Sequence, residues 1–259
     1  MIYLQLYSLV FGICIGSFLN ALIYRLPRRI TIFSSRSRSQ CPKCATQLSW
    51  FENIPVLSYA FLLGKCRKCK SSISLRYPLI ELVVGLFAFV VTPNYLSIER
   101  ISSYFFIISV FATLLTIFVI DLEFKIIPNE LNIYLGLVLF SMVVLTKPYT
   151  YWLSGAMVGF LFPLAVTYGF FLIKGQVGLG GGDIKLYGVL GLYLGPVGII
   201  QNIFLSCFLG ALIGGILIIF RVVDRKTPIP FGPFIVSIAA LQFFIPDYFD
   251  QAVKFFMLG

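Results

Sequence analysis

Long apolar runs, separated by short polar connections, make up most of the chain. A helix crosses a bilayer with about 17–25 mostly apolar residues, and such windows lie at 3–24, 78–93, 101–121, 131–147, 152–173, 184–201, 203–221 and 231–247. The second window is short, and the sixth contains Gly191, Gly195 and Pro196. Since 59% of the 259 residues are hydrophobic and 12% are charged, unlike a soluble domain, we predict an all-α polytopic membrane protein with about eight transmembrane helices.

The first span also carries a pattern that predicts helix packing. Gly12 and Gly16 lie four residues apart and give the span a small-residue face, which suits close approach of a second helix. Asn20 is a polar residue on the same span, and we expect it to hydrogen-bond to another helix.

Basic residues are concentrated between the first two predicted spans. Segment 25–76 contains eleven of the 20 Lys and Arg residues and one acid, Glu52. The positive-inside rule makes this segment cytoplasmic and puts the N-terminus outside. The basic side chains could meet anionic lipid, and they indicate nucleic acid only weakly, so the lipid bilayer is an expected partner and nucleic acid is not. We therefore expect a first span at 1–24, a cytoplasmic insertion at 25–77 and a membrane-embedded core at 78–259.

Four cysteines give the insertion a metal-binding pattern. Cys41 and Cys44 form one C-x2-C pair, Cys66 and Cys69 form another, and 21 residues separate them. This is the spacing of a zinc ribbon. The chain has no His, so the site would be closed and all-thiolate, which favours a structural zinc over a catalytic one. The alternatives are disulfides, which a reducing cytoplasm disfavours, and free thiols.

Two aspartates stand out against the apolar background. Asp121 ends the third predicted span, and Asp183 follows the glycines of GLGGGDIK at 178–185. A carboxylate at membrane depth costs about 3 kcal/mol on insertion scales, so two of them at the same predicted cytoplasmic edge indicate a shared site. Pairs of carboxylates that share a proton activate water in aspartic peptidases. The structural alternative makes Asp183 only the N-cap of the following helix.

The helix ends predict which carboxylate is charged. Pro128 ends the third helix soon after Asp121, so Asp121 lies near a helix C-terminus and Asp183 near an N-terminus. The helix dipole then favours the anion at Asp183 and the proton at Asp121. Glu81 is a third acid at membrane depth, and it could pair with Arg76 or belong to a separate site.

A proton-coupled transporter is the competing function, with Asp121 and Asp183 as its proton relay. Transporters often show inverted repeats and helices broken at the midplane, whereas these acids lie at one edge and no repeat is visible. A membrane-anchored zinc-ribbon adaptor is a third class, and it would leave both aspartates without a role.

Several separated motifs carry a family resemblance. They are GSFLNALIYRLP at 16–27, the two cysteine pairs, RYPLIEL at 76–82, DLEFKIIPN from 121, GLGGGDIK at 178–185 and IPFGPF at 229–234. With them, nearly the whole chain resembles the type IV prepilin peptidase family, also called leader peptidase/N-methyltransferase. Gly180–Asp183 matches the G-x-G-D signature of intramembrane aspartyl peptidases.

The resemblance implies a function in the bacterial cytoplasmic membrane. It makes Asp121 and Asp183 the catalytic pair of an endopeptidase that removes a basic leader from prepilins or pseudopilins, cutting after a glycine on the cytoplasmic side. Many members then methylate the new N-terminal residue with S-adenosylmethionine. No strand-turn-helix nucleotide signature is present, so methylation rests on the resemblance alone, and we expect the donor site away from the aspartates, near Glu81.

Overall fold

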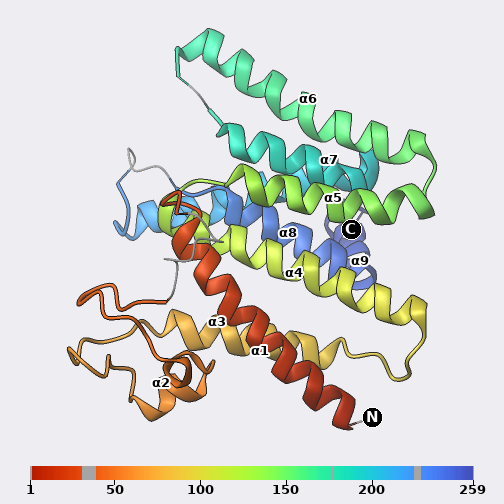
Figure 1. Ribbon diagram of the computed structural model, residues 1–259. Coiled ribbons are helices and arrows are strands. Elements are labelled where there is room, and N and C mark those ends of the chain that lie inside the picture. Colours follow the sequence, from red (N-terminus) through yellow and green to blue (C-terminus); the bar gives the residue numbers. More distant parts are fainter. Residues whose placement is uncertain (1, 31–38, 177, 225–228, 259) are drawn as a thin grey trace. The chain divides into compact units, whose positions relative to one another are not determined.

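The computed structural model describes residues 2–30, 39–176, 178–224 and 229–258 of the chain (Figure 1). The described residues form helices and loops with two isolated β-bridges, which confirms the predicted all-α class. The chain divides into two compact units, Met1–Ala112 and Thr113–Gly259. The elements are α1 (Ile2–Arg25), the 3-10 helix η1 (Trp50–Asn53), α2 (Leu57–Phe61), α3 (Arg76–Val90), α4 (Ile98–Phe124), α5 (Asn129–Thr146), α6 (Tyr149–Lys174), α7 (Gly181–Ile219), α8 (Gly232–Phe244) and α9 (Pro246–Leu258).

Among the described residues, five helices are long and apolar enough to cross a membrane, namely α1, α4, α5, α6 and α7. The 39-residue α7 contains both the sixth and the seventh predicted spans. The helix is broken at Gly195, inside the sixth predicted span and not at its boundary with the seventh: Gly195 has a non-helical φ of 70° and ψ of −179° and precedes Pro196. The second and eighth predicted spans correspond to the shorter helices α3 and α8.

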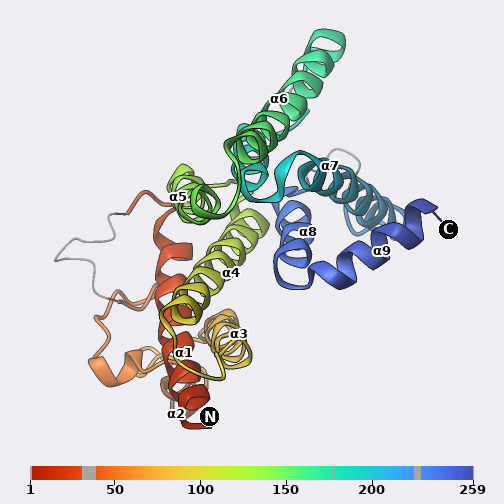
Figure 2. The ribbon, with the colours of Figure 1, turned by 90° about the vertical axis from the view of Figure 1, so that its right-hand side faces the viewer.

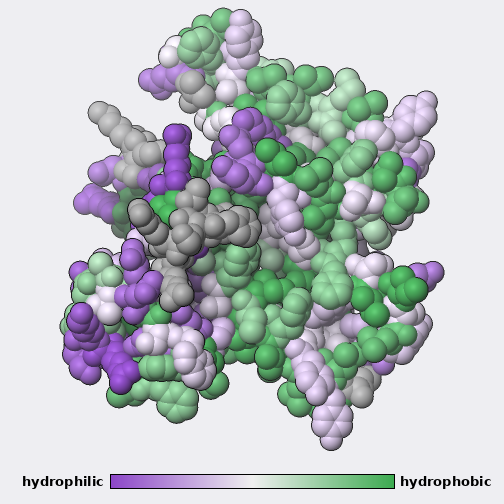
Figure 3. All heavy atoms as spheres, in the orientation of Figure 1, coloured by the Kyte–Doolittle hydropathy of each residue, from purple (hydrophilic) through white to green (hydrophobic). Residues whose placement is uncertain are grey.

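The first unit is built on close packing of α1 against α3. A Cβ on Gly12 would lie 2.6 Å from the Cβ of Ala88, and a Cβ on Gly16 would lie 2.6 Å from the Cα of Glu81. The predicted small-residue face is therefore confirmed, since any larger residue would separate the helices. Asn20 forms the expected interhelical bond, donating from Nδ2 to the carbonyl of Tyr77 at 3.0 Å. Hydrophilic residues of this unit gather over the cysteine segment (Figure 3).

In the second unit α6 packs along the first half of α7, and α8 packs against the second half (Figure 2). Gly155 of α6 contacts the backbone of Gly191 so closely that neither position has room for a side chain. Between α7 and α8, Asn202 donates to Gln242 Oε1 at 2.8 Å, and Gln242 donates to the carbonyl of Gly198 at 2.8 Å. Backbone contact and hydrogen-bonded amides thus hold these helices together, which is how helices associate in lipid.

Candidate active site and metal centre

Asp121 lies in the last turn of α4 and is 4% exposed. The helix ends directly after it: Lys125 adopts a φ of 56°, its N–H bonds to the carbonyl of Asp121 at 2.9 Å, and Pro128 then begins the next turn. The carboxylate Oδ2 of Asp121 accepts the backbone N–H of Gly232 at 2.8 Å. A donor from a segment more than a hundred residues away therefore fixes this carboxylate.

Gly232 is the functional residue that the sequence reasoning missed. It opens α8, and a Cβ on it would lie 2.8 Å from Oδ2 and 3.1 Å from Cγ of Asp121. Only glycine leaves room for the carboxylate at this distance. Pro233, the next residue, has no N–H, so Gly232 supplies the donor at this point of the helix. The available signal was a glycine between Phe231 and Pro233 in IPFGPF.

Asp183 lies in the first turn of α7, three residues after its N-cap, Gly180. Asp183 is therefore not the N-cap itself, which was the structural alternative. Its carboxylate folds back over Gly180, where a Cβ would lie 2.8 Å from Oδ2. A glycine at position 180 thus leaves space for the acid of the same motif.

The structure brings Asp121 and Asp183 close enough for their charges to interact. The start of α5 joins them, because Asn132 Nδ2 donates to the carbonyl of Gly182 at 3.4 Å and Lys185 Nζ donates to Asn129 Oδ1 at 2.8 Å. The end of α4 and the starts of α5, α7 and α8 therefore meet around two carboxylates. Such a pair can exchange a proton with a water between its members.

The helix ends no longer distinguish the two aspartates as the sequence suggested. Asp121 lies at the C-terminal end of α4, but the N–H of Gly232 at the start of α8 stabilises a carboxylate there. Asp183 also lies at a helix start. Which carboxylate holds the shared proton stays a prediction.

The four cysteines of the insertion form one cluster in the first unit. Their Sγ atoms all lie within 4.8 Å of one another, and those of Cys41 and Cys69 are 3.8 Å apart. Zn–S bonds of about 2.3 Å in a tetrahedron put sulfurs about 3.8 Å apart. The cluster is therefore arranged to hold a metal ion of this size with little movement.

The two cysteine pairs adopt the same backbone conformation, 25 residues apart. In each pair, the carbonyl of the first cysteine accepts a hydrogen bond of 2.9 Å from the backbone N–H of the residue four positions later in the chain. That later residue has a positive φ. In each, an isolated β-bridge also closes the loop. The equivalent positions are Ala45 and Lys70 for the positive φ, and Gln40–Gln47 and Lys65–Ser72 for the bridges.

These loops aim N–H groups at sulfur. The backbone N–H groups of Cys44 and Lys43 lower the pKa of the Cys41 thiol to about 6. The hydroxyl and the backbone N–H of Ser71 lower the pKa of the Cys69 thiol. Thiolate is the form that binds metal, so these contacts favour the ligand form at Cys41 and Cys69, whereas burial raises the pKa of the Cys66 thiol.

Glu81 lies in α3, in the same unit, and is 6% exposed. Its Oε2 accepts the N–H of Val56 at 2.7 Å, and Val56 begins α2 with a φ of 62°. The sequence left open a pairing with Arg76 or a separate site, and the structure shows a further contact, to the backbone of the insertion. Glu81 therefore anchors the insertion to α3.

Two family models match the sequence. The Bacterial Peptidase A24 N-terminal domain matches residues 10–95, and the Type IV leader peptidase family matches residues 108–215. No solved structure matches the chain.

Curated relatives named prepilin leader peptidase/N-methyltransferase align with most of the chain. The protein from Vibrio cholerae serotype O1 is 35% identical over 253 residues, covering 94% of this chain and 97% of its own length. The protein from Bacillus subtilis is 34% identical over 255 residues, with 96% of both chains covered. The protein from Aeromonas salmonicida is 34% identical over 260 residues, covering 88% of this chain and 87% of its own. The chain is therefore a member of the type IV leader peptidase family and carries the family's bacterial N-terminal domain.

Proposed function

We propose that this protein is a multi-pass aspartic endopeptidase of the bacterial inner membrane that removes the leader from type IV prepilins or pseudopilins. The observation that carries the proposal is the convergence of Asp121 and Asp183 where α4 ends and α7 begins. The relatives' names supply the substrate class. A pair of weakly exposed acids held by backbone groups supplies the chemistry.

In the proposed mechanism, one carboxylate takes a proton from a water between the pair while the other, protonated, donates to the carbonyl of the scissile peptide. Two like charges at short range cannot both ionise cheaply, so the pair titrates as a unit. Gly232 keeps Asp121 in position by its N–H, and Gly180 leaves room for Asp183. We propose that cleavage follows a glycine of the substrate.

The charge distribution supports cleavage on the cytoplasmic side. With the basic segment 25–76 cytoplasmic and the N-terminus outside, threading the predicted spans puts Asp121 and Asp183 at the cytoplasmic edge. The basic leader of a prepilin would then reach the aspartates without crossing the bilayer. We propose this orientation together with the division into a first span at 1–24, a cytoplasmic insertion at 25–77 and a peptidase core at 78–259.

Two bound groups complete the proposal. Cys41, Cys44, Cys66 and Cys69 would hold one zinc ion, which contributes folding energy to the insertion and takes no part in cleavage. S-adenosylmethionine would supply the methyl group for the new N-terminal amine of the cleaved pilin. The methylation step comes from the family and from the relatives' names.

Cleavage of a synthetic prepilin by the purified full chain tests the proposal. Mass spectrometry should show loss of the leader after glycine. Asp121→Asn and Asp183→Asn should each reduce the rate by about a hundredfold or more. Glu123→Gln is the matched control, since Glu123 is an exposed acid two residues from Asp121, and it should retain most of the rate. An aspartate variant that inserts stably and cleaves at the wild-type rate would overturn the mechanism.

A further inference from the structure

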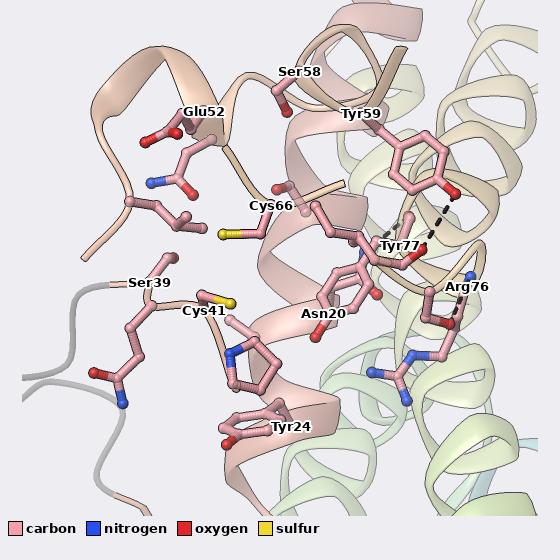
Figure 4. Close-up of a pocket in the computed structure, with 18 of the residues that line it drawn as sticks. Asn20, Tyr24, Ser39, Cys41, Glu52, Ser58, Tyr59, Cys66, Arg76 and Tyr77 are labelled. Carbon is pink, nitrogen blue, oxygen red and sulfur yellow. Dashed lines mark hydrogen bonds between the residues drawn. The ribbon is translucent and has the colours of Figure 1, made fainter. Parts of the chain in front are cut away.

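The short helix α2 turns its polar side inward and its apolar side outward. Ser58 and Tyr59 line the cavity between the insertion, α1 and α3 (Figure 4). On the other side of the helix, Leu57 and Phe61 are 54% and 84% exposed, and Ala60 is exposed as well. Residues at these spacings share one helix face. The outward face of α2 is therefore made of apolar residues alone.

The turn that ends α2 adds a further exposed apolar residue. Leu63 is 84% exposed and takes a φ of 50°. The N–H of Gly64 closes this turn on the carbonyl of Tyr59 at 2.9 Å. We call the exposed apolar residues of the helix and its turn the α2 patch, and its members are Leu57, Ala60, Phe61 and Leu63. Exposed apolar patches mark surfaces that meet a partner or a membrane.

A hydrogen bond holds the start of α2 beside the second turn of α3. Glu81 Oε2 accepts the N–H of Val56, the N-cap of α2, at 2.7 Å. Glu81 lies five residues into α3 from Arg76, which is about 7 Å along the helix at a rise of about 1.5 Å per residue. The helix α2 therefore starts alongside α3 and not beyond its end.

The outer side of α3 is an apolar stripe. Its exposed residues recur every three or four positions and are Leu75, Leu79, Leu82, Leu86 and Val90. The other side of α3 packs on α1, which is long and apolar enough to cross a membrane, so the stripe faces lipid. Leu79 precedes Glu81 in the chain, and the lipid-facing stripe therefore reaches the level at which Glu81 holds α2. The α2 patch lies at the same level.

The charge of the insertion complements the surface of an anionic bilayer. Segment 39–75 has five basic residues and one acid, Glu52, whose carboxylate accepts the N–H of Ser49 at 2.7 Å. A zinc ion on four thiolates would add two negative charges, and the segment would stay positive. The cytoplasmic leaflet carries anionic lipid that attracts Lys and Arg. All five basic residues are exposed, and they are Lys43, Lys65, Arg67, Lys68 and Lys70.

We propose that α2 is an interfacial helix that seats the insertion on the cytoplasmic leaflet of the bilayer. Its apolar patch enters the boundary between headgroups and acyl chains, and Lys65 and Lys68, which follow the patch in the chain, contact the lipid phosphates. Helices with leucine and aromatic residues on one face lie in this boundary, about 5–10 Å deep. The proposal uses the proposed cytoplasmic orientation of the insertion and is independent of the aspartate pair.

Quenching of tryptophan by lipids brominated on their acyl chains tests the proposal with the full chain reconstituted in bilayers. The chain has two tryptophans, and Trp50→Phe with Trp152→Phe removes both. In this background Phe61→Trp reports from the α2 patch, and Leu57→Trp reports from the same helix face if Phe61→Trp fails to fold. The matched control is Gln47→Trp, since Gln47 is an exposed polar residue of the first cysteine loop.

We expect quenching at position 61 to be at least about threefold stronger than at position 47, because the patch lies about 5–10 Å deep in the interface. Equal quenching at the two positions, or none at position 61, would overturn the proposal. Emission at position 61 that is unquenched by lipid but shifts to the blue when prepilin is added would assign the patch to the substrate and contradict the membrane assignment.

The lysines give a second measurement on the same variant. Lys65→Gln together with Lys68→Gln should weaken quenching at position 61 by about twofold in bilayers that contain phosphatidylglycerol, since each basic residue near an anionic surface contributes about 1 kcal/mol. The same pair of changes should have little effect in bilayers of phosphatidylcholine alone. Unchanged quenching in the anionic bilayers would contradict the contact between these lysines and the headgroups.

Discussion

The two units position their functional groups by opposite means. In the first, a cluster of four cysteines lies within two short loops whose geometry repeats at an interval of 25 residues. In the second, two aspartates meet because the ends of long helices converge, with one carboxylate held by a glycine 111 positions away. The first arrangement depends on local loop geometry and, as we propose, on a metal. The second depends on helices approaching to backbone contact.

Removing ligands of the cysteine cluster is the strongest test of this comparison. Replacing Cys41 and Cys44 by Ser should remove about one zinc per chain and unfold the insertion, because structural zinc contributes about 10–16 kcal/mol of apparent binding free energy. Elemental analysis and limited proteolysis of 39–75 would measure both effects. The second unit should stay folded, since it contains none of the ligands. A metal-free wild type with a stable insertion would contradict the zinc assignment.

In the second unit, the corresponding test disrupts the backbone contact between α6 and α7. Gly191→Val should destabilise that unit by about 3 kcal/mol or more, because the side chain would collide with the backbone of Gly155. Gly169→Ala is the control on α6, since a Cβ there meets nothing within 4 Å. Thermal unfolding in detergent should show a lower midpoint only for Gly191→Val. Equal midpoints would mean that the helices do not pack so closely.

Much of this contrast could be predicted from the sequence, and the exceptions have one physical cause. The C-x2-C spacing sets ligand geometry within a few residues, and apolar length sets the spans, so both follow from local pattern. The helix break in α7 was indicated by Gly195 and Pro196. The bond from Gly232 to Asp121 and the bond from Val56 to Glu81 join segments distant along the chain, and no local pattern encodes which N–H will meet which acid.

Adding a single methyl group at Gly232 tests its contact with Asp121. Gly232→Ala should lower the cleavage rate by about a hundredfold, because the Cβ would displace the carboxylate of Asp121 and a shift of about 1 Å costs this much. Gly215→Ala in α7 is the control, since its Cβ would meet nothing within 4 Å. A Gly232→Ala protein with the wild-type rate would show that Asp121 needs no fixed position.

Substitution of Glu81 should separate methylation from leader removal, and it is the smallest effect that we predict. Glu81→Gln keeps an acceptor for the N–H of Val56 but removes the negative charge from the expected methyl-donor site near Glu81. Methylation of the cleaved pilin should fall by about tenfold, whereas leader removal should change little. Mass spectrometry of one reaction reads both products. Equal loss of both activities would assign Glu81 a purely structural role.

A double-mutant cycle on Asp121 and Asp183 tests the central claim most directly. If the two carboxylates act on one water, each Asp→Asn change alone removes the shared chemistry, and residues that act as a unit are strongly non-additive. We therefore predict that the double variant cleaves prepilin about as slowly as either single variant, with all three proteins stably inserted. Independent, multiplying losses, or a single variant that keeps the wild-type rate, would contradict a shared aspartate pair.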